Sequence, residues 1–117
     1  MNKSLVAAGA IDAGLAVAAG AFGAHALRDR LEPRSLEIFE TAARYQMYHA
    51  LAILLCAVIA TSGARTAGWI MQAGIVIFSG SLYLLAATDV KVLGAITPIG
   101  GLAFLIGWAW LAISALR

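Results

Sequence analysis

Four long apolar stretches leave few alternatives to a membrane-spanning fold for this chain. They cover about residues 5–24, 44–62, 67–88 and 92–116. Each has roughly the 20 residues that a helix needs to cross a hydrocarbon layer about 30 Å thick. Lipid offers the backbone no hydrogen bonds, so helices, which bond their own peptide groups, are the default spanning elements. The sequence therefore predicts an all-α, multi-pass membrane protein with four transmembrane helices.

The composition supports this prediction and weighs against other classes. Of the 117 residues, 62% are hydrophobic and 12% are charged, whereas soluble domains are about half apolar and about a quarter charged. The net charge is only +2 and no basic face with interleaved aromatic residues is present, so nucleic-acid binding has no support. Cys56 is the only cysteine, which excludes an intrachain disulfide and a cysteine-based zinc site. No sequence motif indicates a cofactor or a metal.

The connections predict how the helices are arranged. Residues 62–66 and 89–91 form links so short that neighbouring helices must be antiparallel. The link after the first helix is longer, and Pro33 suits the first turn of a helix, where its missing N–H costs nothing. We expect the second helix to start near Pro33 and to extend beyond the membrane, and a separate interfacial helix is the alternative. The chain then forms a single antiparallel four-helix transmembrane domain of residues 1–117, with helices over about 5–24, 33–62, 67–88 and 92–116.

Small residues line the first helix at roughly one-turn spacing. Such residues let two helices approach closely, and van der Waals contact then stabilises the helix pair in lipid. The stripe predicts either close packing inside one bundle or a seam between two copies. The segment also resembles a secretory signal, but its apolar run is longer than a usual signal core, so we expect it to remain as the first helix. The small residues are Gly9, Ala13, Ala16, Gly20 and Ala24.

Polar and aromatic side chains gather toward the helix ends nearest to the long link. Counting residues from each helix end places them at similar depth, so we expect one polar cluster, framed by Glu40 and Arg44. Two histidines could bind a proton or a metal, but zinc usually needs three or four protein ligands. The alternatives are histidines that cap helix ends, tyrosines that anchor at the interface, and a structural Glu40–Arg44 ion pair. The candidate residues are His25, Glu40, Arg44, Tyr45, His49, Tyr83, Thr97 and Pro98.

Asp12 is predicted to lie apart from this cluster. It is about 20 Å from His25 along the first helix. A carboxylate in lipid is costly unless it is paired or protonated, so it should face the interior of the bundle. Its expected neighbours at that depth are Gln72 and Ser79. Such an acid marks either an ion path or a hydrogen-bonded group that locks helices together.

Pro98 is expected to interrupt the last helix, because proline removes a backbone hydrogen bond, and Gly100 and Gly101 follow it. Broken helices occur in transporters beside a substrate cavity. The alternative is a kink that serves packing alone.

The distribution of basic residues predicts the orientation. Five of them lie on the side of the long link and three on the other side, which favours a cytoplasmic long link. Basic residues near a membrane surface attract anionic lipid, at roughly 1 kcal/mol each. The candidates for this attraction are Arg28, Arg30 and Arg34.

Ordered motifs along the chain resemble one known family. They are GAFGAHAL (20–27), FETA (39–42), RYQMYHAL (44–51), FSGSLY (78–83) and TPIGG (97–101). In this order they resemble the domain-of-unknown-function 423 family of small bacterial inner-membrane proteins. The resemblance covers nearly the whole chain and implies a four-helix protein of the bacterial inner (cytoplasmic) membrane. It implies no established reaction, and its recurring residues coincide with the predicted polar cluster.

Three functions are compatible with the sequence. The leading hypothesis is a structural or partner-binding membrane element with the long-link face as its contact surface, because no nucleophile, phosphate-binding or metal motif indicates an enzyme. The second is a small channel or proton-linked transporter, built as a homo-oligomer around Asp12, His49 and Pro98. The third is a lipid-binding protein or membrane enzyme that uses His25 and His49.

Overall fold

The computed structural model describes residues 1–117, apart from the side chain of Ala24. The described residues are helical outside short links and contain no strand. They form four rods, each long and apolar enough to cross a membrane, which confirms the all-α class. The third rod is continuous and contains a π-helical segment, η1. The elements are α1 (Lys3–His25), α2 (Pro33–Ile59), α3 (Ser62–Gly74), η1 (Ile75–Ser79), α4 (Gly80–Thr88) and α5 (Val92–Ala115).

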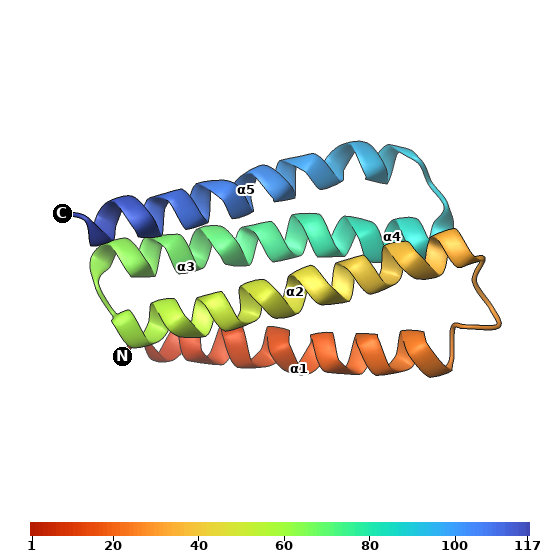
Figure 1. Cartoon of the computed structure of the whole chain (residues 1–117), viewed down its shortest axis with the longest axis horizontal. Coiled ribbons are helices and arrows are strands. Elements are labelled where there is room, and N and C mark those ends of the chain that lie inside the picture. Colours follow the sequence, from red (N-terminus) through yellow and green to blue (C-terminus); the bar gives the residue numbers. More distant parts are fainter.

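The four rods lie side by side and alternate in direction, as the short links predict (Figure 1). α2 and the α3–η1–α4 rod are the inner members, and α1 and α5 lie on opposite edges. The molecule measures 49 × 26 × 17 Å, so the bundle is flattened rather than round. Both ends of the chain lie at the end of the molecule opposite to the long link, residues 26–32.

The second helix is one continuous element. Pro33 occupies its first turn, after Glu32 in an extended conformation, as expected for a residue without an N–H. The helix runs for 27 residues, or about 40 Å, which exceeds the thickness of a hydrocarbon core. The structure therefore has one continuous α2, as predicted, and no separate interfacial helix precedes it in the described residues. It ends at Ile59 rather than near residue 62, because Ala60 adopts a left-handed φ of 61°.

The third rod starts earlier than the expected residue 67. Thr61 is the N-cap of α3, and its side chain accepts a hydrogen bond from the Ala64 backbone N–H at 3.1 Å. A threonine in this position satisfies one of the free N–H groups of the first turn, so the helix can begin at Ser62. Residues 63–66 are therefore helix, and the link from α2 is reduced to Ala60 and Thr61.

Small residues bring the rods together, as helix pairing in lipid requires. Gly9 is buried against Leu54 of α2, and Ala16 is also buried, so this part of the predicted stripe packs inside the bundle. Gly20 faces open space, and the side chain of Ala24 lies outside the described residues. The larger side chains of the buried core are Leu5, Ile53, Met71, Ile75 and Phe104.

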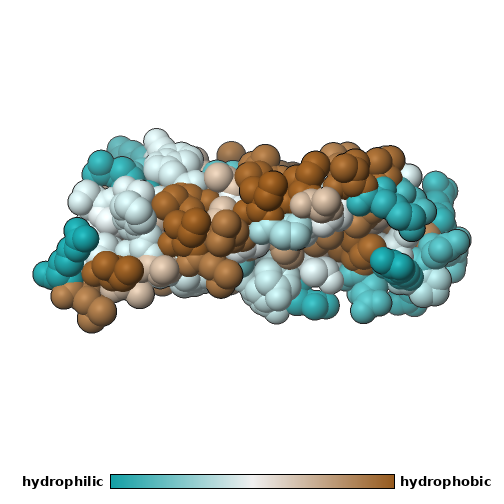
Figure 2. Space-filling view, turned by 90° about the horizontal axis from the view of Figure 1, so that it is seen from above, coloured by the Kyte–Doolittle hydropathy of each residue, from teal (hydrophilic) through white to brown (hydrophobic). Residues whose placement is uncertain are grey.

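The surface changes character along the long axis. Figure 2 shows hydrophobic surface over the middle of the molecule and hydrophilic surface gathered at its ends, most of it at the end of the long link. This is the pattern of a bilayer-spanning protein whose two ends reach the lipid headgroups.

Candidate functional site

The predicted polar cluster does not form one site, because its members lie on different sides of the bundle. His25 at the end of α1 is exposed, and so are Glu40 and Arg44 on α2. His49 and Tyr83 turn inward and bond to partners on other helices. The predicted cluster is therefore divided: His25, Glu40 and Arg44 lie on the surface, and His49 and Tyr83 face the interior.

His49 lies among aromatic rings between α2 and α5. Its Nε2 accepts a hydrogen bond from Trp108 Nε1 at 3.1 Å, and its Nδ1 is 2.8 Å from the backbone oxygen of Tyr45. A carbonyl oxygen only accepts, so Nδ1 carries the hydrogen and donates it. The ring also stacks on Phe104, with centroids 3.5 Å apart and planes 8° apart. Both ring nitrogens are thus engaged, and among the described residues no group of three or more His, Cys, Asp or Glu could hold a metal.

Gln46 joins three helices and was not among the predicted site residues. It is buried on α2, and its Nε2 donates to the backbone oxygen of Asp12 in α1 at 2.7 Å. Its Oε1 accepts a hydrogen bond from the Tyr83 hydroxyl of α4 at 2.8 Å. The sequence could have indicated Gln46 as a contact residue, because a glutamine within an apolar membrane helix needs a hydrogen-bond partner. Gln46 thus connects Asp12 and Tyr83, which were predicted to belong to separate groups.

The Asp12 carboxyl group turns into the bundle, and only 7% of the residue is exposed. Gln72 of α3, one of its two expected neighbours, lies beside it. Ser79, the other one, donates instead to the backbone oxygen of Ala42 at 2.8 Å. Among the described residues, Asp12 Oδ2 and Gln72 Oε1 are buried and have no hydrogen-bond donor. Two adjacent side chains therefore each keep one unsatisfied oxygen in the interior.

Pro98 does not interrupt α5, which continues through it as one helix. The proline itself is exposed. The neighbouring Thr97 hydroxyl lies 2.6 Å from Ser81 Oγ and links α5 to α4. The irregular backbone lies instead in η1, where Phe78 packs against Gly100. The interpretation of Pro98 as a break in the helix is therefore wrong.

A shallow groove of about 320 Å³ lies on the surface between α1 and α2. Ala16, Gly20 and Ala43 form its apolar part, and Glu40 and Arg44 complete its lining. Glu40 and Arg44 both belong to the described residues, and no ion pair within 4.0 Å joins them, so the expected pair is not formed. The groove thus lies beside exposed side chains of both charges, on the part of α2 nearest to the long link.

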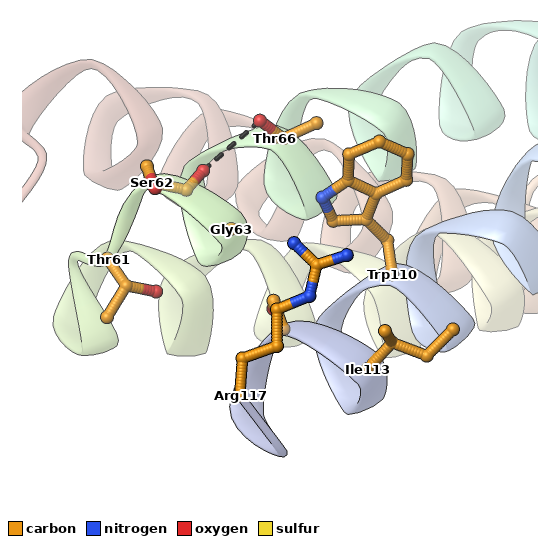
Figure 3. A pocket seen from close by; sticks show the side chains of 8 residues that line it. Thr61, Ser62, Gly63, Thr66, Trp110, Ile113 and Arg117 are labelled. Atoms are coloured by element: carbon orange, nitrogen blue, oxygen red, sulfur yellow. Dashed lines mark hydrogen bonds between the residues drawn. The ribbon is translucent and has the colours of Figure 1, made fainter.

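A second hollow, of about 520 Å³, opens at the opposite end of the molecule, between the start of α3 and the end of α5. Figure 3 shows Arg117 reaching from the C-terminus past Gly63 toward Thr66 and Trp110. The Thr66 hydroxyl already donates to the backbone oxygen of Ser62 at 3.1 Å. No sequence signal indicated this hollow, because its two walls are far apart in the chain.

Comparison with known proteins decides the family. Residues 19–101 match the family described as "Protein of unknown function (DUF423)". The chain belongs to the DUF423 family. Similar proteins include the UPF0382 membrane protein YwdK of Bacillus subtilis, which is 46% identical over 98% of each chain. A UPF0382 membrane protein of Staphylococcus epidermidis strain ATCC 12228 is 49% identical, and SAB0533 of Staphylococcus aureus is 48% identical. Both of these alignments cover 98% of this chain and 97% of the relative. No solved structure matches. The resemblance drawn from the motifs is confirmed, and the DUF423 protein is a membrane protein whose family has no established biochemical function.

Gln46→Leu should weaken the junction of α1, α2 and α4 in this DUF423 protein. Leucine fills a similar volume but removes both hydrogen bonds and leaves the Tyr83 hydroxyl without its acceptor. Hydrogen bonds between membrane helices contribute about 0.6 kcal/mol each and at most about 1.7 kcal/mol, so we expect the free energy of unfolding to fall by about 1–2 kcal/mol. Unfolding in mixed micelles with increasing SDS, followed by tryptophan fluorescence, measures the change. Tyr83→Phe removes one of the two bonds and should cost about half as much; a Gln46→Leu protein as stable as the original would contradict the assignment.

Proposed function

We propose that this DUF423 protein is a structural or partner-binding element of the bacterial inner (cytoplasmic) membrane, with the long-link face as its contact surface and that face in the cytoplasm. One observation supports the proposal above all. Most interior polar side chains are engaged with other helices or with helix carbonyls, as Gln46, His49 and Ser79 are. Apart from Asp12 and Gln72, the polar groups that are free to bind another molecule therefore lie mainly on the surface.

The long-link face carries most of the free charge. Its charged residues are all exposed, and they include both signs, so the face suits a polar or charged partner rather than an apolar one. Arg28 and Arg30 of the long link and Arg34 in the first turn of α2 add attraction for anionic lipid, at roughly 1 kcal/mol each. The charged residues are Arg28, Asp29, Arg30, Glu32, Arg34, Glu37, Glu40 and Arg44.

A photo-crosslinking amino acid at Glu32 tests the proposal in living cells. We expect it to capture one defined protein or lipid partner, and we expect the capture to fall severalfold when Arg28, Arg30 and Arg34 are changed together to glutamine. The same crosslinker at Ser62, exposed at the opposite end of the molecule, is the control. Equal products from both positions, or capture unaffected by the triple substitution, would reject the long-link face as the contact surface.

A proton-linked transporter is the second candidate, and the two unsatisfied oxygens of Asp12 and Gln72 favour it. A buried acid with an oxygen to spare can accept a proton, which is how intramembrane acids serve proton paths. A bundle of four rods is thin for a path, so this candidate requires a homo-oligomer. Proton entry into proteoliposomes loaded with a pH-sensitive dye should be abolished by Asp12→Asn; absence of entry by the unaltered protein would eliminate this candidate.

A further inference from the structure

The groove between α1 and α2 combines features that a lipid needs from its binding site. Its floor is made of the small residues Ala16, Gly20 and Ala43, and Gly20 has no atom within 4 Å of the position that a Cβ would take. Glu40 and Arg44 stand at its side, both exposed, and no ion pair joins these two described residues. The groove therefore offers a ligand a shallow apolar surface with one negative and one positive side chain beside it.

The depth of Arg44 indicates which ligand group it meets. Gly23, near the end of α1, packs against the ring of Phe39, which places these two residues at one level. Arg44 follows Phe39 by five residues on α2, so its Cα lies about 7–8 Å farther from the long-link end. An arginine on the lipid-facing surface at such a depth extends toward the headgroups, where the lipid phosphates lie. Its planar guanidinium suits a phosphate because it can form two parallel hydrogen bonds.

We propose that this groove binds phosphatidylethanolamine, with Arg44 on the phosphodiester, Glu40 on the primary ammonium, and the start of an acyl chain over Ala16, Gly20 and Ala43. This inference rests on the proposed function and names a lipid as one partner of the long-link face. The order of the charges supports it. Arg44 lies deeper than Glu40 by one helical turn, and in this lipid the phosphate is joined to the glycerol while the ammonium lies at the outer end.

The two charges discriminate between headgroups. Phosphatidylglycerol has a phosphate for Arg44 but no cation for Glu40. Phosphatidylcholine has a cation, but its quaternary ammonium has no N–H to donate to the Glu40 carboxylate. The hydroxyls of phosphatidylglycerol can donate a hydrogen bond to the Glu40 carboxylate but bring no positive charge. A primary ammonium both donates hydrogen bonds and pairs with the negative charge of the carboxylate, and this is the stronger interaction. We therefore expect the groove to prefer phosphatidylethanolamine over both other lipids by about tenfold.

Native mass spectrometry of the delipidated full chain tests the preference. The protein is incubated with an equimolar mixture of the three lipids carrying identical acyl chains, and the retained lipid is identified. We expect one phosphatidylethanolamine per chain. Arg44→Gln should reduce its retention about tenfold, whereas Glu40→Gln should leave the phosphate contact and remove the preference for phosphatidylethanolamine over the other two lipids. Equal retention of the three lipids by the unaltered protein would overturn the proposal, and so would a preference for phosphatidylethanolamine that persists in Glu40→Gln.

Two glycines provide a matched pair of variants that leave every charge in place. Gly20→Leu fills the floor of the groove, and Gly14→Leu adds the same group elsewhere on α1, where a Cβ also meets no atom within 4 Å. Leucine is a better helix former than glycine, so neither change should unfold α1. We expect Gly20→Leu to lose the bound lipid and Gly14→Leu to keep it; equal retention by the two variants would overturn the assignment of the groove. If the groove fails these tests while crosslinking at Glu32 still depends on Arg28, Arg30 and Arg34, the lipid inference is wrong and the proposed function stands.

Discussion

Gly100→Ala should weaken the packing of α5 against η1 and lower the stability of the bundle. A Cβ on residue 100 would overlap the backbone nitrogen of Phe78 and come within 2.7 Å of its Cα, so a turn of a neighbouring rod, rather than a flexible side chain, would have to move. The packing of α5 depends on few residues, because only Gly100, Phe104 and Gly107 are buried along its length. Overpacking of this kind typically costs about 1–3 kcal/mol, and a clash with backbone should fall in the upper part of this range. After the gain of about 1 kcal/mol from the better helix propensity of alanine, we expect a net loss of about 1–2 kcal/mol.

The expected result is a protein that still inserts in membranes but unfolds at markedly lower SDS fractions, with α5 accessible to protease in mild detergent. Gly94→Ala is the matched control on the same helix, because its Cβ would lie an ordinary 3.7 Å from Leu85. The control should be as stable as the original or slightly more stable. If Gly100→Ala matched Gly94→Ala in stability, the close contact between α5 and η1 would be refuted.

His49→Ala should produce the second large effect, a loss of about 3 kcal/mol in the free energy of unfolding. The substitution removes the ring stacked on Phe104 and leaves the Trp108 N–H without its acceptor. It also leaves a hollow where α2 meets α5, and close contact is the main source of stability between membrane helices. Equilibrium unfolding in SDS-containing micelles measures the loss.

Conservative variants separate stacking from hydrogen bonding at this position. His49→Phe keeps an aromatic ring beside Phe104 and removes both hydrogen bonds, so it should cost less than His49→Ala. A double-mutant cycle of His49→Phe with Trp108→Phe should give a coupling of about 1 kcal/mol. A coupling near zero would show that Trp108 does not donate to His49 in the membrane.

The sequence predicted the four helices well because the bilayer restricts the possible answers. An apolar run of given length has one stable conformation in lipid, and short links leave only antiparallel neighbours. The helix ends were less predictable. The start of α3 at Ser62 depends on the side-chain cap from Thr61, which looks like part of a loop when only hydropathy is considered.

The polar cluster could not be predicted as a unit, because counting residues gives depth along a helix but not direction around it. At about 100° per residue, Gln46 and His49 point about 60° apart on α2, and Arg44 points about 160° away from Gln46. Gln46 accordingly meets α1 and α4, His49 meets α5, and Arg44 reaches the surface. Which neighbour each side chain meets depends on which helices pack together. The apolar residues are spread too uniformly around each helix to predict that packing from the sequence.

Because both ends of the chain lie at one end of the molecule, two copies can be joined head to tail by a short flexible peptide without a further membrane crossing. Such a tandem fusion holds its two halves in the same orientation across the bilayer. An assembly that forms between the two halves of one fused molecule must therefore be built from parallel copies, whereas a pairing of inverted copies is impossible within the fused pair.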